Sequence, residues 1–207
     1  FFQNIDKLKA ENEELKQKNS ELEQKLREFE IVKSENETLK EYVNLKEKYN
    51  NYESIPSYVI NKEISNFGST IIINVGKKDG VEPNMTVISD KGLVGYIIST
   101  TNTTAKVQTI IDTATAVSAT ITTSRDSILV RGTLDANYTL KATYIPTDAK
   151  LLQGDIIETS GIGGIYPKGI KIGTIKEIIN TKNITDRYAI IETAVDFSKL
   201  ETVLVIK

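Results

Sequence analysis

The 207-residue chain contains no cysteine and no histidine. Without cysteine it forms no disulfide, carries no thiolate nucleophile and offers no sulfur ligand to a metal. Without histidine it lacks a Ser-His-Asp triad, histidine-based zinc sites and the usual general base near neutral pH. An enzyme built on this sequence would therefore depend on carboxylates, lysine or tyrosine for catalysis. We also expect that the protein binds no cofactor.

An excess of charge and a long hydrophobic run are also missing. The 26 Lys and Arg residues nearly balance the 28 Asp and Glu residues, for a net charge of −2. This balance argues against nucleic-acid binding, because no basic excess is available to neutralise phosphates. No stretch approaches the roughly 18–20 apolar residues that are needed to cross a bilayer.

Glycine and proline are absent from residues 3–52, whereas residues 54–207 hold all twelve glycines and all four prolines. The first segment is dense in Glu, Lys, Leu and Asn, which is typical of a long helix. The second is rich in Ile, Val and Thr, which favours strands. Pro56 disfavours helix at the residue before it. We therefore predict two domains, a coiled-coil helix over residues 1–53 and an all-β domain over residues 54–207.

A heptad repeat runs through the first segment and continues, one residue out of phase, towards its end. No second heptad segment follows, so the partner helix must come from another molecule. We predict a homodimer whose interface is formed by the a and d residues: Ile5, Leu8, Asn12, Leu15, Asn19, Leu22, Leu26, Phe29, Asn36, Leu39 and Val43.

Charges beside this stripe indicate a parallel, in-register pair of helices. In such a pair each g residue faces the e residue five positions further along the partner. Asparagine at a positions favours the same arrangement. A single solvated helix is the alternative, but it would leave the apolar stripe exposed. The predicted g–e pairs are all opposite in sign: Glu11/Lys16, Lys18/Glu23, Lys25/Glu30 and Glu35/Lys40.

The second segment reads as about twelve short strands separated by turn signals, which suggests one sandwich or two small antiparallel β-barrels. A weak internal repeat favours two barrels, because residues 78–97 and 151–175 both end in an apolar-Gly-x-Ile sequence. The expected strands are residues 57–64, 70–75, 86–89, 93–99, 105–111, 116–121, 128–132, 140–144, 155–159, 170–179, 188–193 and 202–206.

Candidate catalytic residues are few. Ser160 lies among glycines, as a nucleophile beside backbone N–H donors would, and its base would have to be Lys168. A Ser-Lys pair is an unspecific pattern, and glycines also serve tight β crossings. Acidic residues at strand ends are commoner as solvated turn residues than as a glycosidase-like pair; they are Asp112, Asp155, Glu158 and Asp196. We predict no catalytic, cofactor-binding or metal-binding residue.

Several motifs of the β segment occur together. The run Gly92-Leu93-Val94-Gly95 is followed downstream by Thr159-Ser160-Gly161 and Gly164-Ile165-Tyr166-Pro167-Lys168-Gly169. With Met85-Thr86-Val87-Ile88 before them, these motifs resemble the MreC family of bacterial rod-shape-determining proteins, and the resemblance covers essentially the whole chain. One departure is Asn84, where the family usually has Gly. Asparagine tolerates positive φ, so the change is mild.

The resemblance implies a non-enzymatic scaffold with two β-barrels, similar to chymotrypsin-like folds but without a triad. It implies a single-pass protein of the bacterial cell membrane, with this chain on the extracytoplasmic side. The membrane helix would precede Phe1-Phe2, since aromatic residues concentrate at the interface.

The resemblance further implies a role in peptidoglycan synthesis during elongation and in cell shape. The implied partners are MreB, MreD, RodA and a class B penicillin-binding transpeptidase, and whether dimers assemble further stays open. The alternative is a coiled-coil and β-barrel adaptor of a secretion or efflux complex. That class usually has a helical hairpin with two arms, whereas this sequence has one arm.

Overall fold

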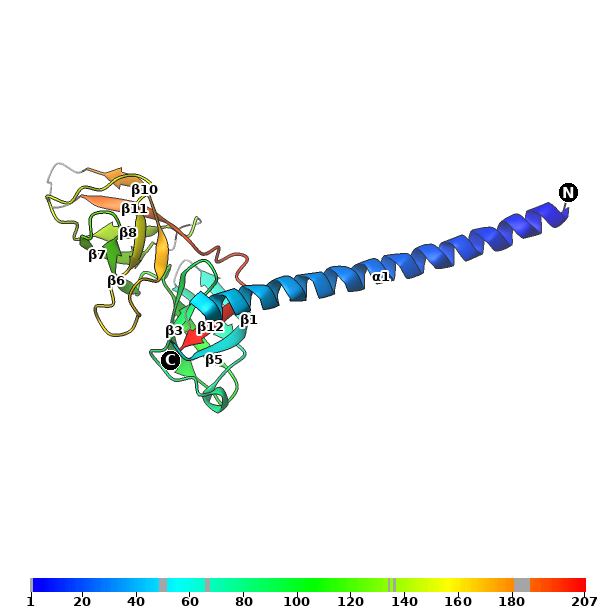
Figure 1. Ribbon diagram of the computed structural model, residues 1–207, viewed down its shortest axis with the longest axis horizontal. Coiled ribbons are helices and arrows are strands. Elements are labelled where there is room, and N and C mark those ends of the chain that lie inside the picture. The colour runs from blue at the N-terminus through cyan, green and yellow to red at the C-terminus, as the bar shows by residue number, and fades with distance from the viewer. Residues whose placement is uncertain (1, 49–51, 66–67, 134, 136, 181–186) are drawn as a thin grey trace. The chain divides into compact units, whose positions relative to one another are not determined.

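The computed structural model describes residues 2–48, 52–65, 68–133, 135, 137–180 and 187–207. One N-terminal helix precedes an all-β part with two closed barrels, as the sequence predicts (Figure 1). The chain divides into two compact units, Phe1–Asn44 and Leu45–Lys207. The helix ends at Lys48 and the first strand begins at Ser54. The boundary predicted after residue 53 stays a prediction, because residues 49–51 lie outside the described part.

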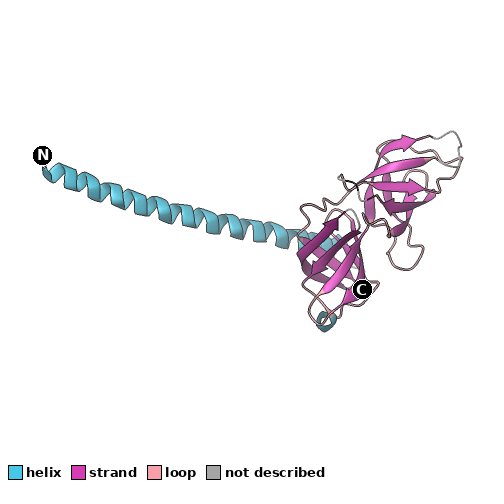
Figure 2. Ribbon diagram, turned by 180° about the vertical axis from the view of Figure 1, so that it is seen from behind, coloured by secondary structure: helices cyan, strands magenta, loops and turns pink. Residues whose placement is uncertain are grey.

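Helix α1 spans Phe2–Lys48 and is about 70 Å long at 1.5 Å per residue. It forms because its sequence has no helix breaker and is rich in residues with high helix propensity. Figure 2 shows it as one uninterrupted helix. Within the described part of the chain, no helix combines the length and the apolar character that crossing a membrane requires.

Barrel 1 is closed by six antiparallel strands in the hydrogen-bonded order β1-β12-β3-β4-β5-β2. Alternate side chains point inward, so that isoleucine, valine and leucine fill the interior. The C-terminal strand pairs with both β1 and β3, which closes the barrel. Its strands are β1 (Ser54–Ser65), β2 (Gly68–Ile73), β3 (Thr86–Ile88), β4 (Leu93–Thr100), β5 (Ala105–Thr109) and β12 (Thr202–Ile206). A 3-10 turn, η1 (Lys77–Asp79), follows β2.

Barrel 2 is built in the same way, in the order β10-β11-β8-β7-β6-β9. Its strands are β6 (Ala116–Ile121), β7 (Ser127–Gly132), β8 (Leu140–Thr143), β9 (Ile156–Thr159), β10 (Lys171–Ile179) and β11 (Tyr188–Thr193). The described residues thus hold twelve strands, each at a predicted segment. Of the two predicted architectures, the pair of barrels is confirmed and the single sandwich is wrong.

The two barrels have the same topology. The cycle β12-β1-β2-β5-β4-β3 in barrel 1 corresponds to β6-β7-β8-β11-β10-β9 in barrel 2, so β4 is equivalent to β10. In barrel 1 the first place in this cycle is taken by the C-terminal strand, drawn in red beside the cyan β1 in Figure 1. The register agrees as well, since Gly95 pairs with Thr109 and Gly173 pairs with Thr193. The internal repeat in the sequence therefore reflects two related barrels.

Asn84 occupies a left-handed turn, with φ 71°. Its backbone N–H donates to the carbonyl of Ile97 at 2.8 Å. At the equivalent place in barrel 2, Gly154 has φ 90° and its N–H donates to Ile175 at 2.8 Å. Asparagine is among the few residues other than glycine that adopt this conformation readily.

We predict that Asn84→Gly leaves the free energy of unfolding nearly unchanged, whereas Asn84→Val lowers it by about 1–2 kcal/mol. The β-branched side chain is the worst suited to a left-handed backbone, since its Cβ crowds the following carbonyl. Urea denaturation measures the difference. Asn102→Val is the matched control, because Asn102 is exposed and is not among the residues with positive φ. Equal losses at both positions would contradict the prediction.

Candidate functional site

The predicted dimer stripe lies open on α1. Its described large apolar side chains are each 56–64% exposed: Leu15, Leu22, Leu26, Phe29, Leu39 and Val43. Asn12, Asn19 and Asn36 are exposed too. The side chains of Ile5 and Leu8 lie outside the described part. Residues at heptad spacing share one helix face, so the single chain leaves a continuous apolar stripe without cover.

Charged residues beside the stripe make short-range contacts within the single helix. Lys16 lies 3.3 Å from Glu13, and Lys18 lies 2.8 Å from Glu14. All four side chains are about two-thirds or more exposed, so each pair contributes only about 0.2–0.5 kcal/mol. Both lysines are therefore free to exchange these contacts for carboxylates of a second helix at little cost.

The family motifs meet at the junction of the two barrels. The hydroxyl of Thr86, the first residue of β3, donates to the carbonyl of Ile165 at 2.6 Å. The ring of Tyr166 packs edge-on against Tyr96 of β4, with centroids 6.2 Å apart and planes at 86°. Such aromatic pairs add about 0.5–1.5 kcal/mol beyond the burial of their area. Residues 160–169 of barrel 2 are thereby fixed to barrel 1.

Tyr166 is the most deeply buried aromatic side chain of this junction, with 7% of its surface exposed. Burial raises its pKa, and the neighbouring Tyr96 raises it further, so the phenol stays neutral at physiological pH. Its hydroxyl has no hydrogen-bond partner among the described residues. The motif residue thus acts here as a packing element, not as an acid or base.

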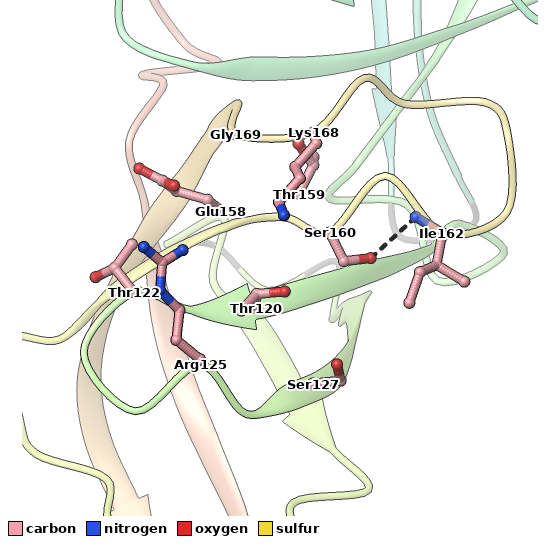
Figure 3. A pocket seen from close by; sticks show the side chains of 10 residues that line it. All are labelled: Thr120, Thr122, Arg125, Ser127, Glu158, Thr159, Ser160, Ile162, Lys168 and Gly169. Atoms are coloured by element: carbon pink, nitrogen blue, oxygen red, sulfur yellow. Dashed lines mark hydrogen bonds between the residues drawn. The ribbon is translucent and has the colours of Figure 1, made fainter.

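Ser160 is held by the backbone around it. Its hydroxyl donates to the carbonyl of Ser118 at 3.1 Å and lies 2.8 Å from the hydroxyl of the same residue. It also accepts the N–H of Ile162 at 3.2 Å (Figure 3). Lys168 lines the same pocket, but no hydrogen bond joins it to Ser160 in the described structure. A serine nucleophile needs a base within hydrogen-bond reach, and Ser160 instead fastens its loop to β6.

Two of the four carboxylates are buried, where the sequence predicted solvated turn residues. Asp112 is 4% exposed and accepts the N–H groups of Ser69 at 2.7 Å and Ala114 at 2.8 Å. Asp155 is 9% exposed and accepts the N–H of Leu152 at 2.9 Å. The predicted solvation is therefore wrong for both residues. Both carboxylates stabilise turns, because each accepts a backbone N–H group two or three residues away in the sequence.

The other two carboxylates lie nearer the solvent. Asp196 accepts the hydroxyl of Ser198 at 2.5 Å, which lowers the pKa of this exposed carboxyl. Glu158 on β9 is half-buried and pairs in register with Lys171. Among the described residues, no group of three Asp, Glu, His or Cys side chains is placed to hold a metal ion.

A polar pocket of about 270 Å³ opens on barrel 2, between the β6–β7 turn and the segment that joins β9 to β10 (Figure 3). Sequence reasoning missed this pocket, since the turn that carries Arg125 contains neither glycine nor proline and gives no signal. The lining residues are Thr120, Thr122, Arg125, Ser127, Glu158, Thr159, Ser160, Ile162, Lys168 and Gly169.

A second, more open groove of about 560 Å³ follows the junction of the barrels. Pro83 and Met85 line it from barrel 1, and Ile165, Tyr166 and Pro167 line it from barrel 2. Its apolar lining comes largely from the family motif.

Comparison with known proteins agrees with these motifs. A family model described as rod shape-determining protein MreC, barrel core, matches residues 59–207. The cell shape-determining protein MreC of Listeria monocytogenes is 32% identical over 175 residues, which cover 83% of this chain and 59% of that protein. The protein of the same name from Bacillus subtilis is 32% identical over 219 residues, with 99% and 75% covered. The chain thus spans about three fifths to three quarters of these relatives.

Solved structures show the same fold. An MreC structure superposes with a TM-score of 0.79 at 23% identity and covers 85% of this chain and 99% of its own. MreC in a complex between penicillin-binding protein (PBP2) and MreC from Helicobacter pylori superposes with a TM-score of 0.58 at 17% identity, with 75% and 98% covered. The family model matches most of the chain, and the Bacillus protein is 32% identical over 99% of this chain, so the chain belongs to the MreC family of cell shape-determining proteins.

Proposed function

We propose that this protein is a non-enzymatic, extracytoplasmic scaffold of the cell-elongation machinery, which organises peptidoglycan synthesis and so maintains cell shape. The observation that carries the proposal is the exposed heptad stripe of α1, joined in one chain to the barrel core of the MreC family. An exposed apolar stripe on a long helix is suited to pairing with a second copy. The two barrels then offer rigid surfaces for other proteins.

The absence of enzymatic activity is supported by the local chemistry. Ser160 is bonded to its own barrel, and Asp112 and Asp155 accept backbone N–H groups. These hydrogen bonds use the side-chain atoms that a nucleophile or a general base would need for catalysis.

We further propose that a class B penicillin-binding transpeptidase binds this protein, supported by the Helicobacter pylori complex of PBP2 with MreC. MreB, MreD and RodA are proposed partners by family resemblance. The protein would be held at the bacterial cell membrane by an N-terminal helix outside this chain. In cells depleted of their own MreC, the anchored protein should restore rod shape, and crosslinkers at barrel positions should capture the transpeptidase. Failure of both would overturn the scaffold assignment.

We predict that Asn12→Cys crosslinks to itself almost completely under mild oxidation. Facing a positions of a parallel, in-register pair lie close enough for a disulfide. The chain has no native cysteine, so the new thiol is the only reporter. Non-reducing gel electrophoresis measures the dimer fraction.

Asn36→Cys tests the same geometry beyond the shift of the heptad phase and should crosslink as well. The pair of sites guards against an antiparallel dimer whose helices happen to cross at residue 12. A cysteine on the opposite helix face, at Ser20, is the matched control and should crosslink far less. If neither residue 12 nor residue 36 crosslinked in a protein shown to be dimeric, the parallel arrangement would be wrong.

A further inference from the structure

The β6–β7 turn holds an arginine in a conformation that suits glycine. Arg125 has φ 65°, and its N–H donates to the carbonyl of Ile121 at 2.9 Å. The turn is closed by the N–H of Ile121, which donates to Asp126 at 3.0 Å. Left-handed positions in hairpin turns favour Gly, Asn or Asp, because a Cβ crowds the backbone there. The strain at Arg125 suggests that its side chain serves a purpose outside the turn.

The Arg125 side chain reaches into the polar pocket of barrel 2. Figure 3 shows it rising from the turn on one side, while Lys168 comes from the segment on the other side. Neither cation forms a salt bridge or a side-chain hydrogen bond within the described part of the protein, and the same holds for Glu158. The charged groups that line this pocket are therefore uncommitted.

Most of the uncharged residues that line the pocket carry hydroxyl groups. Those of Thr120 and Ser127 make no side-chain hydrogen bond to any described residue, so they are free to bond a ligand. Ile162, which is 66% exposed, supplies an apolar side chain beside them. The pocket thus combines two cations, one carboxylate, free hydroxyls and one aliphatic contact.

This combination defines the ligand. An arginine and a lysine that converge from two sides favour a carboxylate, which arginine binds in a bidentate manner. Free hydroxyls and the Glu158 carboxylate suit the hydroxyl and amide groups of a sugar, and Ile162 suits a methyl group. The single aliphatic contact and the volume of about 270 Å³ fit one sugar unit better than a peptide with several side chains.

We propose that this pocket binds a carboxylate-bearing sugar unit of a glycan. Arg125 and Lys168 hold the carboxylate, and Thr120, Ser127 and Glu158 bond the ring substituents. That the glycan is a cell-wall strand rests on the proposed function. On such a strand the ligand would be a muramic acid unit without a stem peptide, because the peptide is attached through an amide at this carboxyl group.

The test is a titration of the full chain with N-acetylmuramic acid, followed by NMR of the ¹⁵N-labelled protein. N-acetylglucosamine is the matched ligand, because it lacks only the lactyl group that carries the carboxylate and a methyl. We expect saturable shift changes at the pocket residues with the acidic sugar and at least tenfold weaker binding of the neutral one. Equal binding of both sugars, or no saturable binding of either, would overturn the proposal.

The variant Arg125→Gly tests whether sugar binding is lost while the fold is retained. It removes the guanidinium and also relieves the left-handed strain, so we expect at least tenfold weaker binding with a melting temperature that is unchanged or higher. Tyr144→Gly is the matched control, since Tyr144 also has a positive φ of 54°, is 80% exposed and lies outside the pocket. It should gain similar stability and bind the sugar as before. Unchanged binding by Arg125→Gly would show that the pocket is not the site.

A peptide is the rival ligand, so the tetrapeptide Ala-Glu-Lys-Ala forms a second arm of the titration. Binding of this peptide at the pocket without binding of the acidic sugar would overturn the assignment to a glycan. Lys168→Gln should weaken sugar binding, and Arg131→Gln, an exposed change on β7 outside the pocket, should not. If the unaltered chain bound neither sugar and still restored rod shape, the glycan proposal alone would be overturned and the scaffold function would stand.

Discussion

A valine at Gly95 is expected to lower the free energy of unfolding by about 4 kcal/mol or more, enough to unfold a domain of ordinary stability. A Cβ at this position would lie 1.9 Å from the carbonyl oxygen of Gln108 and 2.8 Å from its carbonyl carbon. Both atoms belong to the backbone of β5, which pairs with β4 on one side and β2 on the other. The neighbouring strand therefore cannot move aside without breaking its own ladder.

Gly173→Val should have the same effect, because barrel 2 repeats the arrangement. A Cβ there would lie 2.1 Å from the carbonyl oxygen of Glu192 on β11. Ser99→Val is the matched control, since Ser99 is exposed on β4, and surface changes cost about 0.5 kcal/mol or less. Guanidinium denaturation followed by the near-UV circular dichroism of the tyrosines measures all three variants. Losses below about 1 kcal/mol at both glycines would show that the strands separate more easily than this packing indicates.

Much of the fold was predictable because its signals are local. The helix follows from a segment without Gly or Pro, and the strands follow from short apolar alternations between turns. The internal repeat predicts that Gly95 and Gly173 are equivalent, and the matching topology of the two barrels confirms it. A glycine inside a strand indicates a close approach of another backbone, which the structure confirms at both positions. Which carbonyls approach, those of Gln108 and Glu192, was not predictable, because that depends on the pairing with a neighbouring strand.

The closure of barrel 1 depends on contacts between distant parts of the sequence. Ser54 at the start of β1 pairs with Ile206 near the end of the chain. No local pattern specifies that pairing, so the sequence left a sandwich and two barrels as alternatives. The burial of Asp112 was not predictable from local sequence either, since it depends on a contact with Ser69, which lies 43 residues earlier.

The candidate functional residues also include some that were predictable from local sequence and some that were not. The stripe on α1 was predictable from the heptads alone, because helix geometry fixes which residues share a face. The pocket of barrel 2 was not, because it joins Arg125 to Lys168 across 43 residues of sequence. A turn with a left-handed arginine looks like an ordinary polar turn until its φ is known.

Removal of residues 1–53 is expected to leave a folded β part that is mostly monomeric at micromolar concentration. Both barrels are closed and have their own apolar cores, so the remaining residues bury enough surface to fold alone. The deletion also removes the ion pair between Glu53 and Lys207, but its glutamate is 75% exposed and the loss is small. Analytical ultracentrifugation of the full and shortened chains measures the difference in mass.

A double substitution tests the contribution of the apolar stripe to dimerisation while the rest of the helix is kept. Leu15→Lys with Leu22→Lys should raise the dissociation constant of the dimer at least about 1,000-fold, since four buried leucines are lost per dimer at about 1.5–3 kcal/mol each. Glu13→Lys with Glu21→Lys is the matched control, because it adds positive charge without touching the a and d positions.

If the chain without residues 1–53 sedimented as a stable dimer, the barrels would carry self-association. The exposed stripe of α1 would then need a different partner.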